Sequence, residues 1–253
     1  MRILMVCAAI VFNASSYAQK NIQIGLRYMP TLTALWNKDD KSTGAELHKE
    51  STKSLGTGGI AFDYGFTKTI GLEVDVLYAR NGQEYTGVNL QSGSTAAYNR
   101  VVAIQAMANN TPVTGSYQAK AELNSIKIPI LLKLSTPNTN KMYYTLSVGP
   151  QIDYINDVVY ELNGEDITLT STGIDNKDAY KKTTLDGVIG FGLARNASSH
   201  IVLSAQTRFD YGFGDVEEKN ITYGSPAISY YPSGRAATHS ATASLVFGVS
   251  YKF

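Results

Sequence analysis

Apolar and polar residues alternate with a period of two through much of this chain. The longest such stretch is residues 239–253, HSATASLVFGVSYKF, in which every second position from 241 to 253 is apolar. Side chains of a β-strand point alternately to its two faces, so this spacing predicts a strand with one face that must leave water. We expect no downstream segment to cover that face, because the sequence stops on Phe253.

Seven further segments alternate in the same way, and no charged residue falls on their apolar faces. They are residues 22–28, 60–66, 70–78, 126–134, 142–154, 185–193 and 201–213. The connections are short after the second, fourth and sixth segments and roughly 25 to 40 residues long elsewhere. This arrangement predicts an all-β fold, an eight-stranded antiparallel up-and-down transmembrane β-barrel. Short periplasmic turns, long extracellular loops and periplasmic N- and C-termini follow from it.

Period two alone does not exclude a soluble lipocalin-like barrel, because turning every strand inside out preserves the alternation. The composition of the polar face distinguishes a membrane barrel from a soluble one. This face is rich in Gly and Ala, which fit a crowded interior better than a solvated surface. It also carries ten charged residues: Arg27, Asp63, Glu73, Asp75, Lys127, Lys133, Asp153, Asp186, Arg208 and Asp210. Eight strands enclose an interior about wide enough for side chains. We therefore predict a plugged lumen.

The ten charges are interpreted as a structural network, because buried charges must be paired. We expect Glu73 and Asp75 to pair with Lys127 and Lys133 on the neighbouring strand. A proton or ion path is the alternative function for the same residues. On the opposite, lipid-facing side, a Lys or Arg at the bilayer midplane would cost about 2 to 4 kcal/mol, so the absence of charge there is informative.

The N-terminus predicts export. Residues 3–12 form an apolar run of half the roughly 20 residues that a membrane-spanning helix needs, followed by Ser16-Tyr17-Ala18. We expect residues 1–18 to be a cleaved signal peptide and residues 19–253 to be one barrel domain. Cys7 would leave with that peptide, and the large Val6 before it disfavours a lipoprotein. Disulfides and thiolate metal sites are then excluded, and the net charge of +1 argues against nucleic-acid binding.

Two stretches carry a family resemblance. The last strand resembles the terminal strand of bacterial outer-membrane barrels, which implies that Phe247, Val249, Tyr251 and Phe253 are a signal to the barrel-assembly machinery. Residues 124–134, NSIKIPILLKL, and residues 144–150, YTLSVGP, resemble strands of the PorT-like outer-membrane barrels of Bacteroidota. That resemblance implies a place in a Gram-negative outer membrane, surrounded by its lipid. PorT is linked to type IX secretion, which makes a secretion partner one possibility.

No catalytic, cofactor or metal site is predicted. Ser198 and His200 share a turn, His48 falls in a predicted loop and His239 begins the last strand, so no nucleophile, base and orienting group come together. Asp175, Asn176 and Asp178 lack the spacing of a known calcium loop and are interpreted as turn formers. The large aromatic residues are expected to form interfacial girdles: Trp36, Tyr28, Tyr64, Tyr78, Tyr154, Tyr211 and Tyr251.

The sequence thus predicts an integral outer-membrane protein, not an enzyme, with a structural or interaction role through its surface loops. Residues 82–117 are the longest of these loops and carry no recognisable motif. Three alternatives remain open: an accessory of protein secretion, a narrow pore for small solutes, and a lipid-modifying barrel enzyme.

Overall fold

The computed structural model describes residues 22–38, 48–88, 116–137, 142–162, 165–167, 176–218, 222–223, 228–229 and 236–253. The strands are β1 Ile22–Trp36, β2 His48–Gly65, β3 Ile70–Val88, β4 Ser116–Ser135, β5 Met142–Leu162, β6 Glu165–Ile167, β7 Thr183–Asn196, β8 Ile201–Gly212, β9 Thr222–Tyr223, β10 Ile228–Ser229 and β11 His239–Lys252, with one 3-10 helix, η3 Asn176–Ala179. The predicted signal peptide with Cys7, and Asp175, lie outside the described residues.

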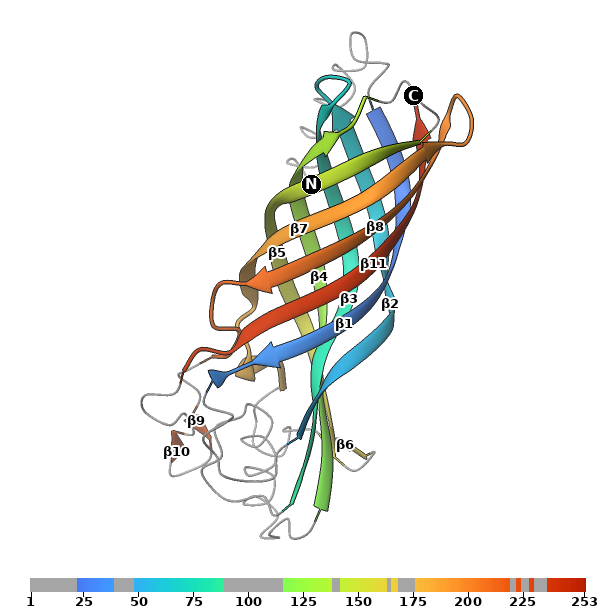
Figure 1. Ribbon diagram of the computed structural model, residues 1–253. Helices are drawn as coiled ribbons and strands as arrows, with labels where there is room; N and C mark the ends of the chain where they lie inside the picture. Colours follow the sequence, from blue (N-terminus) through green and yellow to red (C-terminus); the bar gives the residue numbers. More distant parts are fainter. Residues whose placement is uncertain are drawn as a thin grey trace, which may run out of the picture.

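Eight long strands close into one antiparallel barrel (Figure 1). The order around the wall is β4-β3-β2-β1-β11-β8-β7-β5, and pairing of β4 with β5 completes the ring. The first and last strands meet in register, with Gln23 opposite Lys252 and Trp36 opposite His239. The predicted fold class is confirmed. No helix among the described residues is long and apolar enough to cross a membrane.

The short connections are turns that side-chain hydroxyls hold closed. Between β2 and β3 the Thr67 hydroxyl accepts hydrogen bonds from the backbone N–H groups of Thr69 and Ile70, at 3.2 and 3.0 Å. Ser198 does the same for His200 and Ile201 between β7 and β8. Such local bonds favour turn over continued strand. We call this end of the barrel the turn end and the opposite end the loop end.

The apolar faces point outward from all eight strands. Leu26, Ile60, Leu245 and Phe247 are 47 to 67% exposed, whereas the residues that alternate with them are buried or nearly so. Glycine on the inner face permits close approach of the strands, because a Cβ on Gly59 would collide with the carbonyl oxygen of Val76 on β3. The interior is therefore the polar face.

Pro30 marks an irregularity in the wall. Proline cannot donate a ladder hydrogen bond and is tolerated in sheets mainly at bulges and edges. Here the pairing of β1 with β2 shifts at that residue, with Met29 opposite Thr57 but Thr31 opposite Ser54. The two strands nevertheless remain paired on both sides of the shift.

Several strands are longer than the sequence predicts, and the large extensions are at the loop end. β3 continues to Val88 and β4 begins at Ser116, so both ends of the predicted loop 82–117 are strand. His48, expected in a loop, begins β2. Beyond the barrel wall these strands carry polar residues on their outer face, so their alternation is no longer between apolar and polar residues. Figure 1 shows β3 and β4 extending well past β1, β8 and β11.

Candidate functional site

The structure places all ten charged residues of the polar face inside the barrel. Nine of them are buried, and the side chain of Lys133 is 19% exposed. They fall into two groups at different heights, the turn-end network (Arg27, Asp63, Glu73, Asp75, Lys133 and Arg208) and the loop-end cluster (Lys127, Asp153, Asp186 and Asp210).

The turn-end network joins strands on opposite sides of the lumen. Arg208 on β8 donates hydrogen bonds to Glu73 at 2.7 Å and Asp75 at 3.0 Å, both on β3. Since β3 and β8 are separated by β2, β1 and β11 in the wall, these bonds cross the interior. The side chains of Arg208 and Asp75 have no exposed surface. These ion pairs therefore span the lumen from one side of the wall to the other.

Two further cations complete the turn-end network. Arg27 on β1 donates to Asp63 at 3.1 Å and lies 3.7 Å from Glu73. Lys133 on β4 donates to Asp63 at 2.5 Å and to Glu73 at 2.9 Å. The three acids are thereby shared among three bases in hydrogen-bonding geometry. Charge-assisted bonds of this kind are among the stronger ones in proteins.

The loop-end cluster gathers three acids around one base. Lys127 on β4 donates to Asp210 on β8 at 3.2 Å and lies 3.8 Å from Asp153 on β5. Asp186 on β7 accepts a bond from the Gln151 amide at 2.9 Å. The same amide lies 3.5 Å from Asp210. Four strands thus contribute to one buried polar cluster.

The expected pairing between neighbouring strands is right for Glu73 and Lys133 but wrong for Asp75 and Lys127. Lys133 lies opposite Gly71 and Lys127 opposite Leu77, so the two expected pairs lie on opposite diagonals of the β3–β4 ladder. A twisted sheet does not bring both diagonals equally close. Asp75 instead meets Arg208 across the lumen, and Lys127 turns to Asp210 and Asp153.

The strands project beyond the barrel as a sheet extension, formed by residues 80–88 of β3, 116–124 of β4 and 157–162 of β5. The outer face changes from Tyr78, Ile126 and Tyr154 to polar residues within one or two positions. Tyr78 donates a 3.1 Å hydrogen bond to Asn124, which is the first polar residue on the outer face of β4 beyond this change. The ten residues after Tyr78 extend about 30 Å at the usual strand rise.

Ion pairs between neighbouring strands cover the outer face of the sheet extension. Lys120 on β4 lies 3.1 Å from Glu122 of its own strand and 3.2 Å from Glu161 on β5. Arg80 on β3 lies 3.8 Å from Glu122. These side chains are partly exposed. A charged face of this kind is suited to water.

The residues weighed for catalysis do not come together. His200 stacks on Tyr251 at 5.4 Å between ring centroids, and its Nδ1 lies 3.1 Å from the Lys252 carbonyl oxygen. The Ser198 hydroxyl is used in the turn and not by the His200 ring. His239 lies at the other end of β11, with its Nδ1 2.9 Å from the Gly212 carbonyl oxygen.

The predicted turn formers fall only partly within the described residues, and Asp175 lies outside them. Asn176 and Asp178 lie in η3. Within the described ranges, no group of three or more His, Cys, Asp or Glu is arranged to hold a metal ion.

The predicted aromatic residues all belong to the outer face, at differing heights. Tyr78 and Tyr154 lie at the loop-end boundary of the apolar band, and Tyr251 at the turn end. Tyr28 is different, because it lies opposite Phe247 halfway along β11. The prediction of a rim position for Tyr28 is wrong, since the outward face of β1 stays apolar beyond it, at Leu32 and Trp36.

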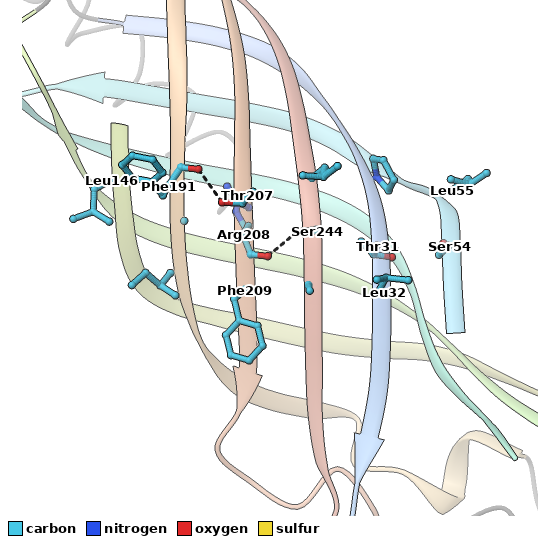
Figure 2. A pocket seen from close by; sticks show the side chains of 15 residues that line it. Thr31, Leu32, Ser54, Leu55, Leu146, Phe191, Thr207, Arg208, Phe209 and Ser244 are labelled. Carbon is cyan, nitrogen blue, oxygen red and sulfur yellow. Dashed lines mark hydrogen bonds between the residues drawn. The ribbon is translucent and has the colours of Figure 1, made fainter. Parts of the chain in front are cut away.

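A shallow hollow of about 690 Å³ crosses the outer wall over β5, β7, β8, β11, β1 and β2 (Figure 2). Phe191, Phe209 and Leu32 stand along it, with the smaller Thr207 and Ala243 between them. The Thr207 hydroxyl donates to the Phe191 carbonyl oxygen at 3.1 Å. The residues that line the hollow are therefore mostly apolar.

Comparison with known proteins decides the family. A family model described as "Outer membrane protein beta-barrel domain" matches residues 12–218, which is more than half of the chain. The chain belongs to this family. No curated protein gives a significant match.

Solved structures similar to the chain include other outer-membrane proteins. OprG from Pseudomonas aeruginosa is 10% identical, with 93% of this chain and 97% of that one covered and a TM-score of 0.44. Neisserial surface protein A is 12% identical, with 92% and 97% covered and a TM-score of 0.44. Ail of Yersinia pestis is 10% identical, with 93% and 99% covered and a TM-score of 0.37.

Membership of the family gives the outward apolar band its role as the lipid-contacting surface. Residues 70–78 of β3 and 126–134 of β4 span nine positions each, which suits the 9 to 11 residues of a tilted transmembrane strand. The hollow of Figure 2 lies within this band. The polar sheet extension starts where the band ends and therefore stands outside the hydrocarbon.

Proposed function

We propose that this outer-membrane barrel is a closed scaffold that holds the sheet extension and the connecting loops at the cell surface for interaction with other molecules. The observation that supports this function is the crosswise filling of the lumen by Arg208, Glu73 and Asp75. A solute path would have to pass these fully buried pairs. Loops and projecting strands on a rigid scaffold are the usual place for binding.

Four further features belong to the same proposal. The loop end is extracellular, which puts the start of β1 and the end of β11 in the periplasm. Residues 1–18 are a cleaved signal peptide. Phe247, Val249, Tyr251 and Phe253 serve recognition by the assembly machinery. The proposed role is not enzymatic, and it is supported by the placement of Ser198, His200 and His239, which do not come together as the catalytic groups of a hydrolase would.

A closed barrel predicts an electrically silent membrane. Purified protein reconstituted in a planar bilayer should give no discrete conductance steps, because ion pairs cross the lumen at the level of Arg208. A general porin inserted from the same detergent is the matched control for insertion and detection. Reproducible unitary steps from the parent protein would contradict the scaffold and favour a narrow pore.

The second candidate function is an accessory role in protein secretion. It is supported by the resemblance of residues 124–134 to PorT-like barrels of Bacteroidota. In the structure, these residues include the lumen-facing Lys127 and Lys133 and the lipid-facing Ile126 and Ile130. The resemblance therefore covers wall and lumen, and partner contacts would have to come from elsewhere on the molecule.

Affinity purification in mild detergent separates the two functions. On the accessory hypothesis, the tagged protein should bring down secretion components in stoichiometric amount from its native outer membrane. Replacing both Lys120 and Glu161 by Ala would alter the sheet extension without touching the lumen. If the barrel comes out alone under conditions that preserve other membrane complexes, the secretion role is rejected.

A further inference from the structure

The surface of the turn end carries cations that no neighbouring acidic side chain balances. Lys68 lies in the β2–β3 turn, Arg195 on the outer face at the end of β7 and Lys252 at the end of β11, and all three are exposed or partly exposed. Within four residues of the strand ends there, the acidic side chains of the described chain are Asp63 and Glu73. Both are buried and paired inside the lumen. The outer surface of this end is therefore positively charged.

The loop end does not share this imbalance. Arg80 and Lys120 lie 3.8 and 3.1 Å from Glu122, and Lys120 also lies 3.2 Å from Glu161. An anionic group would meet carboxylates beside the cations of the sheet extension. At the turn end it would meet the cations alone.

A second shallow hollow, of about 650 Å³, lies on the outer wall over β2, β1, β11 and β8. The apolar side chains that line it are Ile60, Leu26, Val249 and Leu203, with Tyr28 and Phe247 on the side toward the loop end. All of these strands belong to the lipid-contacting band. The occupant of the hollow is therefore hydrocarbon.

Arg195 lies at the turn-end limit of this hollow. Five residues lie directly opposite one another across neighbouring strands, in the order Arg195, Leu203, Val249, Leu26 and Ile60. Arg195 is one residue from the turn end of its strand, and each step across the wall takes the row one residue further from that end, so that Ile60 is five residues away. Four strand spacings give the row a length of about 20 Å. The hollow thus slopes from the rim into the band over a distance comparable to one leaflet, about half of the roughly 30 Å hydrocarbon core.

We propose that this hollow and Arg195 together bind one anionic phospholipid, with an acyl chain in the hollow and the phosphate at the turn-end rim. An arginine can keep its stem on an apolar wall while its guanidinium reaches the headgroup level. The guanidinium then donates two parallel hydrogen bonds to phosphate oxygens. Lys252 and Lys68 add positive charge at the same end of the barrel. With the turn end in the periplasm, an orientation that rests on the proposed function, the lipid belongs to the inner leaflet of the outer membrane.

Selective lipid retention is the test. The purified protein is equilibrated with equal amounts of phosphatidylglycerol and phosphatidylcholine of identical acyl chains, and the lipid that stays bound is counted by native mass spectrometry. The parent should prefer phosphatidylglycerol. Arg195→Gln should lower that preference about fivefold, equivalent to the roughly 1 kcal/mol that one cation contributes near an anionic membrane surface. Arg195→Lys should keep most of the preference, because the charge remains.

Two further variants separate the hollow from the charge. Leu203→Phe fills the hollow beside Arg195 with an apolar side chain and should lower the retention of both lipids. Arg80→Gln removes an exposed loop-end cation and should leave retention unchanged.

Four results would overturn the proposal. They are equal retention of the two lipids by the parent, an unchanged preference in Arg195→Gln, a preference lost in Arg80→Gln instead, and full retention in Leu203→Phe. The measurement does not depend on which end of the barrel faces the periplasm. An orientation opposite to the proposed one would change only the leaflet from which the lipid comes.

Discussion

Replacing Arg208 by Met is expected to destabilise the barrel by about 3 to 5 kcal/mol, the usual cost of breaking a buried ion pair from one side. The substitution keeps an unbranched side chain of similar length but leaves Asp75 with no cation in hydrogen-bonding contact among the residues that the structure describes. Glu73 would retain Lys133 and, at longer distance, Arg27. Equilibrium unfolding in urea from phospholipid vesicles, or the temperature at which the folded band is lost on a gel, measures the effect.

Two variants make the Arg208 result interpretable. Lys120→Met removes a partly exposed cation with two carboxylate neighbours in the sheet extension, and such surface pairs contribute only about 0 to 1 kcal/mol. Arg208→Met combined with Asp75→Leu removes both partners and should recover part of the loss, because no uncompensated acid remains at position 75. If Arg208→Met were as stable as Lys120→Met, the lumenal pairs would not hold the barrel closed.

The barrel itself was predictable from sequence because lipid contact imposes one strict rule on every spanning strand. Each position such as Leu26, Val148 or Leu245 must be apolar, and each alternate position need only fit the interior. This rule produces the period of two and identifies both faces without any knowledge of contacts. It also places all ten charged residues inside, since none of them falls on an apolar face.

Two features of the structure, the ion pair across the lumen and the sheet extension, could not be predicted from the alternation of apolar and polar residues. Arg208 and Asp75 are 133 residues apart and meet only because the sheet closes, so no local spacing announces the pair. The sheet extension was missed because its outer face meets water, and polar residues there hide the alternation. A bulge adds to the difficulty: Asn124 lies opposite Asp157 but Ser125 opposite Ile155, so the outward positions of β5 change from even to odd at Asn156.

Placing an arginine at the middle of the lipid-facing band should be the most damaging change on the outer wall. Val148 is 45% exposed on β5, midway between Met142 and Tyr154, which bound the apolar stretch of that strand. Val148→Arg is expected to destabilise the folded barrel by about 2 to 4 kcal/mol, because the guanidinium would have to leave water for hydrocarbon. Unfolding from vesicles measures the loss, and insertion yield should fall with it.

The same substitution eleven residues later provides the control. Val159 also faces outward on β5, but it lies in the sheet extension opposite Glu122, beyond the level of Asn124 at which the outer face becomes polar. Val159→Arg should change stability by no more than a few tenths of a kcal/mol, since the new cation stays in water beside an acid. The difference between the two variants reports where the membrane ends on this strand. Equal losses would mean that the bilayer covers the sheet extension as well, and the boundary drawn at Tyr78 and Tyr154 would then be wrong.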